Sequence, residues 1–328
     1  MNEEIYVLNT KASEYAKHLE KLRNEIKKTI VGQQEIIDKL IIALVVQGHV
    51  LLEGLPGLAK TLMIKTLSEC VECSFTRLQF TPDLLPADIT GTKIYNHKDG
   101  TFTTMKGPIF ANFILADEIN RAPPKVQSAL LEAMQEKQVS IQGETHVLKK
   151  PFLVMATQNP IESEGTYKLP EAQVDRFAFK ILINHPTKHE EIEIINRFTE
   201  GTTYTTSKIL NANSIIEMQN FNQKIYADEK IKEYVSEIVD ATRYPNNYNV
   251  DVEGYIEFGA SPRASLWLIL AGKAHAMLNS RGYVTPEDIK AVAYDVLRHR
   301  ILLTYEAEAE DVSSDQIINK IVDVIKIP

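Results

Sequence analysis

One stretch decides the fold of this chain: Glu53-Gly54-Leu55-Pro56-Gly57-Leu58-Ala59-Lys60-Thr61. It follows the apolar run Val50–Leu52 and precedes a segment with helical spacing that opens at Leu62. A strand, a glycine-rich loop and a helix in this order form a cradle for phosphate, because the loop N–H groups and the positive end of the helix dipole face the anion. The stretch therefore predicts a phosphate-binding loop within an α/β domain.

Individual residues of the loop have predicted roles in that cradle. Lys60 would reach the β- and γ-phosphates, and the Thr61 hydroxyl would ligate Mg²⁺. Ala59 stands where the pattern G-x-x-x-x-G-K-[ST] has its second glycine. Its Cβ is tolerated if the local φ is negative, and costs about 1 kcal/mol or more if φ is positive. A chance glycine- and proline-rich loop is the alternative interpretation, which the rest of the chain weakens.

Length and composition are typical of a soluble globular protein. The 328 residues are enough for one large or two ordinary domains. A net charge of −8 does not favour general binding to nucleic acid, so we expect no nucleic-acid partner. The apolar run Leu40–Val46 is too short to cross a bilayer, and the opening Met1-Asn2-Glu3-Glu4 has no basic region of a secretory signal. We expect a cytoplasmic protein that is not embedded in a membrane.

The two cysteines, Cys70 and Cys73, form a Cys-x-x-Cys pair. A structural zinc site normally needs four ligands, and no matching Cys/His pair lies at suitable spacing. A redox pair is the other interpretation, but the segment does not open a βαβ unit of its own. We expect two reduced thiols at a helix end.

The first part of the chain alternates between β-like and helical runs. Five nearly continuous apolar runs suit a parallel sheet that is buried on both faces. These runs are Val50–Leu52, Phe75–Gln79, Phe113–Ala116, Phe152–Thr157 and Phe177–Ile183. Two hairpins, with turns at Lys98-Asp99-Gly100 and Gly143-Glu144, interrupt the pattern and are expected to project from the domain.

The character of the chain changes after Asn184-His185-Pro186. Five amphipathic helices are predicted there, at Lys188–Phe198, Ser214–Tyr226, Asp228–Tyr244, Pro262–Asn279 and Pro286–His299. We therefore predict an α/β domain with an N-terminal helix over residues 1–186 and a smaller, all-helical domain over residues 187–328.

Polar residues follow two of the predicted strands. Asp117 and Glu118 end the run that starts at Phe113. Asp117 could bind Mg²⁺ directly or through water, and Glu118 could polarise the attacking water in a hydrolysis. Asn159, at the tip of the next strand, could hold that water against the γ-phosphate. The alternatives are a helix start for the two carboxylates and an ordinary Asn-Pro turn for Asn159.

Arg176 stands just before the last predicted strand. An arginine in this place can act on a neighbouring copy, where it neutralises the charge that develops on the γ-phosphate. A surface cation paired with Asp175 is the alternative.

Arg263 lies in the first turn of a helix that Ser261-Pro262 opens. A cation there opposes the helix dipole by about 0.3–1 kcal/mol, so we expect an anion beside it. A nucleotide phosphate reached from the second domain is one candidate, and Glu253 or Glu257 is the other.

These motifs occur in the order found in AAA+ ATPases, and their wording resembles that of the MoxR family. The resemblance runs from Val31 to about Asp295, and Ala59 fits the wording of this family. The matching motifs are Val31-Gly32-Gln33, the loop from Glu53 to Thr61, Ala116-Asp117-Glu118-Ile119-Asn120-Arg121-Ala122-Pro123-Pro124, Ala156-Thr157-Gln158-Asn159-Pro160 and Leu169-Pro170-Glu171-Ala172-Gln173-Val174-Asp175-Arg176-Phe177.

The resemblance implies a role for each of these motifs. Arg121 stays open, because it could face a neighbouring subunit or simply start a helix. The implied roles are Walker A for Gly54 to Thr61 with Leu62 beside it, the Walker B pair for Asp117 and Glu118, sensor 1 for Asn159, the arginine finger for Arg176, sensor 2 for Arg263, and the adenine pocket for Val31 and Gly32.

The fold that the resemblance implies is an AAA+ P-loop αβα sandwich with inserted β-hairpins and a helical lid. The implied function is a chaperone-like ATPase that uses ATP and Mg²⁺ and matures a partner protein, often one with a von Willebrand A-type domain. Such proteins commonly form hexameric rings. Three alternatives remain: a nucleotide-gated switch with little turnover, which Ala59 would favour, a magnesium-chelatase-like subunit, and a nucleic-acid-linked motor.

Overall fold

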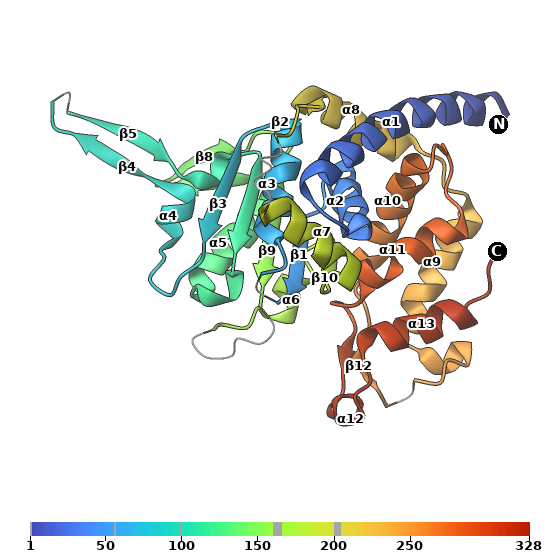
Figure 1. The fold of residues 1–328 in the computed structure, drawn as a ribbon. Coiled ribbons are helices and arrows are strands. Elements are labelled where there is room, and N and C mark those ends of the chain that lie inside the picture. The colour runs from blue at the N-terminus through green and yellow to red at the C-terminus, as the bar shows by residue number, and fades with distance from the viewer. Residues whose placement is uncertain (1, 56, 99, 160–165, 200–204, 253) are drawn as a thin grey trace.

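The computed structural model describes residues 2–55, 57–98, 100–159, 166–199, 205–252 and 254–328. An α/β domain is followed by a helical region (Figure 1). The first domain is built on a five-stranded parallel sheet with the order β10-β1-β9-β6-β3. The strands are β1 (Val50–Gly54), β3 (Phe75–Gln79), β6 (Phe113–Asp117), β9 (Leu153–Gln158) and β10 (Phe179–Ile183). All five predicted strands are thus confirmed.

The sheet is covered on both faces, which explains its nearly continuous apolar strands. Leu115 of β6 shares a core cluster with Met63 of α3 (Lys60–Cys70). Its neighbour Ile114 belongs to a second cluster with Leu130 of α5 (Pro124–Glu136). Because successive side chains of a strand point to opposite faces, β6 contributes to both layers. The predicted αβα sandwich is confirmed.

Two antiparallel hairpins interrupt this domain, as predicted. One consists of β4 (Gly91–Asn96) and β5 (Thr101–Lys106), and the other of β7 (Gln138–Ile141) and β8 (Glu144–Val147). The β4–β5 hairpin extends well away from the rest of the molecule (Figure 1).

The β4–β5 hairpin contributes little to the core. Phe102 and Met105 on β5 are 66% and 61% exposed. The ammonium of Lys93 on β4 is 2.7 Å from Glu144 on β8, so an ion pair joins the two hairpins. Asp99, in the predicted turn, lies outside the described residues.

The helical region after the sheet confirms the five predicted helices. They are α7 (Lys188–Thr199), α8 (Ala212–Lys224), α9 (Glu229–Ala241), α10 (Pro262–Leu278) and α11 (Pro286–Leu297). The sequence analysis did not predict α12 (Tyr305–Ala309), α13 (Ser314–Val324), or the short antiparallel pair of β12 (Ile256–Phe258) and β13 (Leu302–Leu303). The described part of this region is therefore mainly helical but not all-helical, since β11, β12 and β13 also lie in it. The domain boundary at residue 186 stays a prediction.

The remaining elements connect and cover these parts. The N-terminal helix α1 (Asn2–Thr29) packs against both α3 and α10. The short parallel pair of β2 and β11 joins the α/β domain to the start of α8. The other elements are α2 (Gln34–Val46), β2 (Val71–Glu72), α4 (Pro86–Thr90), α6 (Glu171–Val174) and β11 (Leu210–Asn211), with 3₁₀ turns at Pro108–Phe110, Ile119–Arg121 and Pro245–Tyr248.

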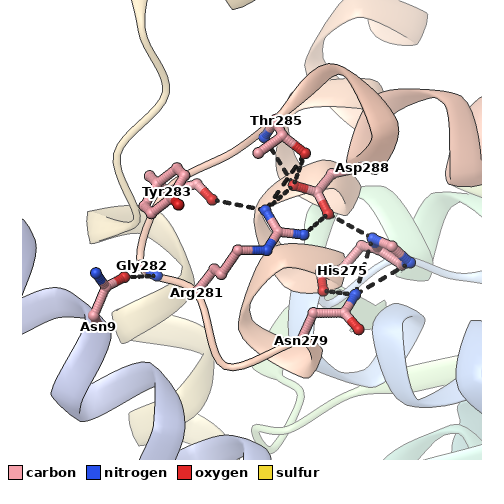
Figure 2. Close-up of polar contacts among 8 residues, drawn as sticks. All are labelled: Asn9, His275, Asn279, Arg281, Gly282, Tyr283, Thr285 and Asp288. Carbon is pink, nitrogen blue, oxygen red and sulfur yellow. Dashed lines mark hydrogen bonds and ion pairs between the residues drawn. The ribbon is translucent and has the colours of Figure 1, made fainter.

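A buried ion cluster ties α10 to α11 (Figure 2). The Asp288 side chain is fully buried and accepts hydrogen bonds from Arg281 Nη2 at 2.6 Å and from His275 Nδ1 at 2.7 Å. It also closes a capping box with Thr285, which confirms the predicted helix start. Burial raises the pKa of Asp288, but hydrogen bonds from His275 and Arg281 and the charge of Arg281 outweigh it, and the pKa falls to about 2.

The loop between α10 and α11, which carries Arg281, also contacts the N-terminal helix. The N–H of Gly282, next to Arg281, donates to the Asn9 side chain of α1 at 2.7 Å (Figure 2). A Cβ at Gly282 would collide with the backbone of Leu8, so glycine allows this close approach. The helix α1 thus contacts the helical region as well as α3 of the α/β domain.

Both cysteines are free thiols, as predicted. Burial is the main cause that raises the pKa of Cys70 to about 12 and that of Cys73 to about 11. Within the described part of the chain, no helix combines the length and the apolar character that a membrane span needs.

Candidate active site

Four of the predicted site residues lie at the carboxyl-terminal edge of the sheet, where ligands of open α/β sheets bind: Lys60, Asp117, Glu118 and Asn159. There β1 leads into the phosphate loop, β6 ends in Asp117, and β9 leads to Asn159. One cavity of about 400 Å³ is lined by Gly57, Leu58, Ala59, Lys60, Thr61, Leu62, Asp117, Glu118, Thr157 and Asn159.

The phosphate loop contains a strained residue. Ala59, the residue before α3, has φ 55° and ψ 21°, in the left-handed region. Ala59 thus adopts the conformation that glycine usually takes. Because Ala59 has a Cβ, this conformation costs about 1–2 kcal/mol. Ala59 offers no side-chain cap to the first N–H groups of α3. These donors suit an anion.

Lys60 folds back over the loop in this structure. Its ammonium donates to the carbonyl oxygens of Gly54 at 2.6 Å and Leu55 at 3.3 Å. Phosphate oxygens would have to replace at least one of these carbonyls when a nucleotide enters. Pro56, which the sequence analysis placed in the same loop, lies outside the described residues.

Asp117 is buried and its two oxygens have different partners. The Thr157 hydroxyl donates to Oδ1 at 2.6 Å. The Arg77 guanidinium donates to Oδ2 from Nη2 at 2.6 Å and from Nε at 3.0 Å. Sequence analysis missed both partners. The signal for Arg77 was its place with Gln79 in the β3 run, two polar residues on one face of an apolar strand.

Glu118 follows Asp117 with a φ of 55°, which turns the chain at the end of β6. Its carboxylate accepts from Gln79 Nε2 at 2.7 Å and lies 3.2 Å from Arg121 Nε. Its own N–H donates to the Thr157 hydroxyl at 2.9 Å, so Thr157 holds both acidic residues. Arg121 therefore pairs within its own chain in this state.

Asn159 is buried just after β9 and lines the cavity of the two carboxylates. The predicted neighbourhood of Asn159, Glu118 and the phosphate loop is thus present. Arrangements of this kind can orient a water molecule toward a terminal phosphate.

An apolar cavity of about 240 Å³ adjoins the loop. It is lined by Thr29, Ile30, Val31, Gln33, Gly57, Leu58, Ala59, Leu62, Met63, Pro186, Ile194 and Phe198. Of the two residues predicted for the adenine pocket, Val31 is among these described lining residues and Gly32 is not. Gly32 has φ 64°, and a Cβ there would collide with Glu190.

Arg176 and Arg263 lie together near the amino-terminal ends of the strands, which we call the opposite edge of the sheet. Arg176 precedes β10, whose first residue Phe179 pairs with Val50 at the start of β1. The phosphate loop follows the other end of β1, about 13 Å away at 3.3 Å per residue. Both arginines line a cavity of about 330 Å³ with Gln47, His49, Met134, Gln135, Lys137, Leu266, Trp267 and Leu270.

Arg263 pairs with a carboxylate that was not among its expected partners. Its Nη1 donates to Asp175 Oδ2 at 2.9 Å, so the carboxylate beside Arg263 is that of Asp175 and not that of Glu257. Glu253, the other candidate, lies outside the described residues. An anion does lie beside Arg263, as expected, but the sequence did not identify it, because Asp175 is 88 positions away. A nucleotide phosphate as a second partner stays a prediction.

Arg176 does not form the ion pair with Asp175 that was the alternative interpretation of this residue. Asp175 binds Ser261, Arg263 and Arg300, and Arg176 does not share it. Within the described ranges, the Arg176 side chain has no hydrogen bond or ion pair. A guanidinium in this state is available to an anion outside its own chain.

Comparisons with known proteins agree with this geometry. Residues 49–179 match the family described as ATPase family associated with various cellular activities (AAA), and residues 250–321 match the AAA lid domain. A crystal structure of a candidate ATPase from Cytophaga hutchinsonii superposes with a TM-score of 0.91 at 50% identity, covering 97% of this chain and 98% of that chain.

Curated relatives match nearly the whole chain. "Chaperone MoxR1" of Mycobacterium tuberculosis is 49% identical, over 94% of this chain and 82% of that protein. "Uncharacterized protein YeaC" of Bacillus subtilis is 43% identical, over 94% and 95%. "Protein MoxR" of Methylorubrum extorquens is 30% identical, over 94% of each chain.

Proposed function

The chain belongs to the MoxR family of AAA+ ATPases, and on this basis we propose that it hydrolyses ATP at a site shared by two copies. One observation carries the proposal: the phosphate loop and the carboxylates line one cavity, while two arginines line another at the opposite edge of the sheet. A single copy therefore cannot bring both halves to one triphosphate.

Binding would use the two cavities beside the loop. The apolar cavity that includes Val31 and Leu62 suits an adenine ring, and the loop N–H groups with Lys60 suit the phosphates. Lys60 then exchanges the carbonyl oxygens of Gly54 and Leu55 for phosphate oxygens.

The residues present fit Mg²⁺, which prefers oxygen ligands. Asp117 offers a buried carboxylate in the same cavity as the Thr61 hydroxyl, and these two residues would hold the ion. When bound, Mg²⁺ would offset negative charge on the phosphates. The ion pair of Asp117 with Arg77 supports this role, because the same carboxylate binds a cationic group in this structure.

Glu118 and Asn159 would act on the attacking water. Glu118 accepts a proton from the water, and Asn159 orients the water toward the γ-phosphate. Glu118 is held by Gln79 and Arg121 in this structure, so its carboxylate must leave these partners to reach the water. That rearrangement would precede attack of the water on the γ-phosphate.

Arg176 and Arg263 would complete the site of a neighbouring copy. Both guanidinium groups then face charge that develops on the γ-phosphate, a contribution of about 10³-fold or more in related reactions. Each copy offers arginines at one edge and a nucleotide site at the other, so head-to-tail contacts would repeat from copy to copy, and we propose that they close into a ring. We propose six copies on the family resemblance.

A protein client would be moved by the ring. The relative from Mycobacterium tuberculosis carries the name chaperone, which supports this class of function. The projecting β4–β5 hairpin, with Phe102 and Met105 exposed, is a suitable contact surface for such a client. A partner with a von Willebrand A-type domain is the client class that we propose.

Steady-state ATP hydrolysis tests the activity. We expect Lys60→Ala and Glu118→Gln each to lower the turnover number by about 10²-fold or more, since charge stabilisation and proton transfer both act on the transition state. Lys65→Ala is the matched control, because Lys65 lies on the same helix in an exposed pair with Glu69. Activity of both site variants equal to that of wild type would refute hydrolysis at this site.

A nucleotide-gated switch with little turnover is the second candidate. Two observations favour it: the strain at Ala59 and the contacts that hold Glu118. In that case wild type would bind ATP tightly, and Glu118→Gln would hydrolyse it at the same low rate. A loss of turnover in Glu118→Gln with unchanged ATP affinity would support the enzyme instead.

A further inference from the structure

Asp175 joins the arginine edge of the sheet to the helical region. It follows α6, directly before Arg176, and its side chain is 15% exposed. Ser261 Oγ donates to Oδ1 at 2.9 Å, Arg300 Nε donates to Oδ1 at 2.8 Å, and Arg263 Nη1 donates to Oδ2 at 2.9 Å. We call these four residues the Asp175 joint.

The joint holds an ionised carboxylate between two guanidinium groups. Burial raises the pKa of Asp175, but the hydrogen bond from Arg263 and the charge of Arg300 outweigh it and hold the pKa below its ordinary value. Two cations on one carboxylate leave a net positive charge at this edge, which suits an incoming polyanion.

Arg300 fixes the backbone on both sides of Arg176. Its side chain is fully buried, and its Nη2 donates to the carbonyl oxygens of Asp175 at 3.0 Å and Phe177 at 2.7 Å. Its Nη1 donates to the carbonyl of Ala178 at 3.2 Å. The segment that carries Arg176 is thus fastened to the end of α11.

The Asp175 joint orients Arg263 but leaves part of its guanidinium group able to bind another partner. One of its nitrogens binds Asp175, while 47% of the side chain remains exposed. Arginine has five donors in a rigid fork, so a guanidinium that is held on one side can still bind an anion on the other. Arg263 and Arg176 line the same cavity, which places both near one prospective ligand.

We propose that Asp175 is a positioning residue that holds Arg263 beside Arg176, so that the two guanidinium groups meet one triphosphate on a neighbouring copy. This inference rests on the proposed function. An arginine that is already oriented loses less freedom when the transition state forms, and preorganised charge stabilises that state most. The ion pair therefore acts on turnover rather than on ATP binding by the same chain.

Asp175→Asn tests the role, because asparagine keeps the shape and removes the charge. We expect the turnover number to fall about ten- to a hundredfold, as for other residues that orient a catalytic group. The KM for ATP should change less than about threefold, because the phosphate loop of the variant is intact and lies at the other edge. An unchanged turnover number would overturn the proposal.

Asp315→Asn is the matched control. Asp315 also accepts two hydrogen bonds from one arginine, Arg298, at 2.9 and 2.8 Å, but it lines neither cavity of the site. We expect wild-type turnover for this variant. If Asp175→Asn fails to fold, Asp175→Glu keeps the charge beside Arg300 and displaces the carboxylate by one methylene, and the same loss is expected.

Mixing variants shows whether Asp175 acts on a neighbour. Asp175→Asn has an intact phosphate loop, and Lys60→Ala has intact arginines. We expect a mixture of the two to hydrolyse ATP faster than the sum of the separate proteins. No gain on mixing would overturn the proposal.

The outcomes separate this inference from the proposed function. If wild type lacks hydrolysis, or Arg176→Ala is as active as wild type, the shared site itself is wrong. If wild type is active, Arg176→Ala is impaired and Asp175→Asn keeps the wild-type turnover number, only the role of Asp175 is wrong.

Discussion

Ala59 and Glu118 both hold left-handed backbone conformations, with φ of 55°, and both line the same cavity. Residues with a Cβ adopt this region at a cost of about 1–2 kcal/mol, and such strain collects at functional sites. The left-handed conformation turns the loop into α3 at Ala59, and it turns the chain after Asp117 at Glu118.

Ala59→Gly should therefore stabilise the fold. We expect the free energy of unfolding to rise by about 0.5–1 kcal/mol, because the relief of strain exceeds the extra chain entropy of glycine. Ala291→Gly is the control: Ala291 is exposed within α11, and the change should destabilise by about 1 kcal/mol. Equal losses in both variants, measured by denaturant unfolding, would contradict the strain at Ala59.

Arg77 should compete with Mg²⁺ for Asp117. Its guanidinium lies 2.6 Å from Oδ2, with half of the side chain exposed. We expect Arg77→Met to lower the Mg²⁺ concentration that gives half-maximal ATPase activity by up to about fivefold, the range of an exposed ion pair. Arg23→Met, which removes the Asp38 pair outside the site, should leave that concentration unchanged. A higher Mg²⁺ requirement in Arg77→Met would exclude competition.

At the scale of elements, the strands were predictable and the polar contacts between elements were not. Strands β1 and β6 begin as short apolar runs, so the local pattern suffices to predict them. The partners of Asp175 lie 86 to 125 positions away, and no local pattern reports them.

The helix α13 was missed although its signal was present. Ser313 and Gln316 form a capping box at its start, and Ile317, Ile318 and Ile321 form its buried face. The roles of Thr157 and Gln79 depend instead on strand neighbours. Gln79 lies opposite Asp117 only because β3 pairs with β6 in this register. The residues that hold the catalytic groups can therefore be identified only from the order of the strands in the sheet, and not from the sequence motif.

The contact between α10 and α11 should respond to acid. The pKa of Asp288 lies near 2 in the folded protein, below its ordinary value of 3.8, so its stabilisation is present above about pH 4 and is lost as the pH falls toward 2. We expect Asp288→Asn to lower the free energy of unfolding at pH 7 by about 2 kcal/mol.

The difference between wild type and Asp288→Asn isolates this group from other carboxylates. It should shrink as the pH falls from 4 to 2, when measured by denaturant unfolding at each pH. A difference that stays constant over this interval would show that the charge of Asp288 does not stabilise the fold.

At the scale of the whole molecule, the sheet separates two incomplete half-sites. One edge carries the phosphate loop with Asp117, and the other carries Arg176 with Arg263. The family resemblance predicted both sets of residues, but only the fold shows that Arg263 lies with Arg176. The head-to-tail assembly that we propose would bring the two half-sites together.

The rate per subunit should consequently depend on protein concentration. Dilution dissociates the assembly and removes the arginines from each site, so we expect the specific ATPase activity to fall on dilution. Arg176→Ala should be slow at every concentration, whereas Lys168→Ala, an exposed cation near the same segment, should behave as wild type. A constant specific activity across the dissociation of the assembly would argue for a complete site in one copy.

Mixing Lys60→Ala with Arg176→Ala tests the shared site most directly. Each protein alone should be nearly inactive, because every site lacks one half. In an equal mixture, about a quarter of the sites pair an intact phosphate loop with an intact neighbouring arginine, so about a quarter of the wild-type rate should return. A mixture no faster than its two components would contradict the account.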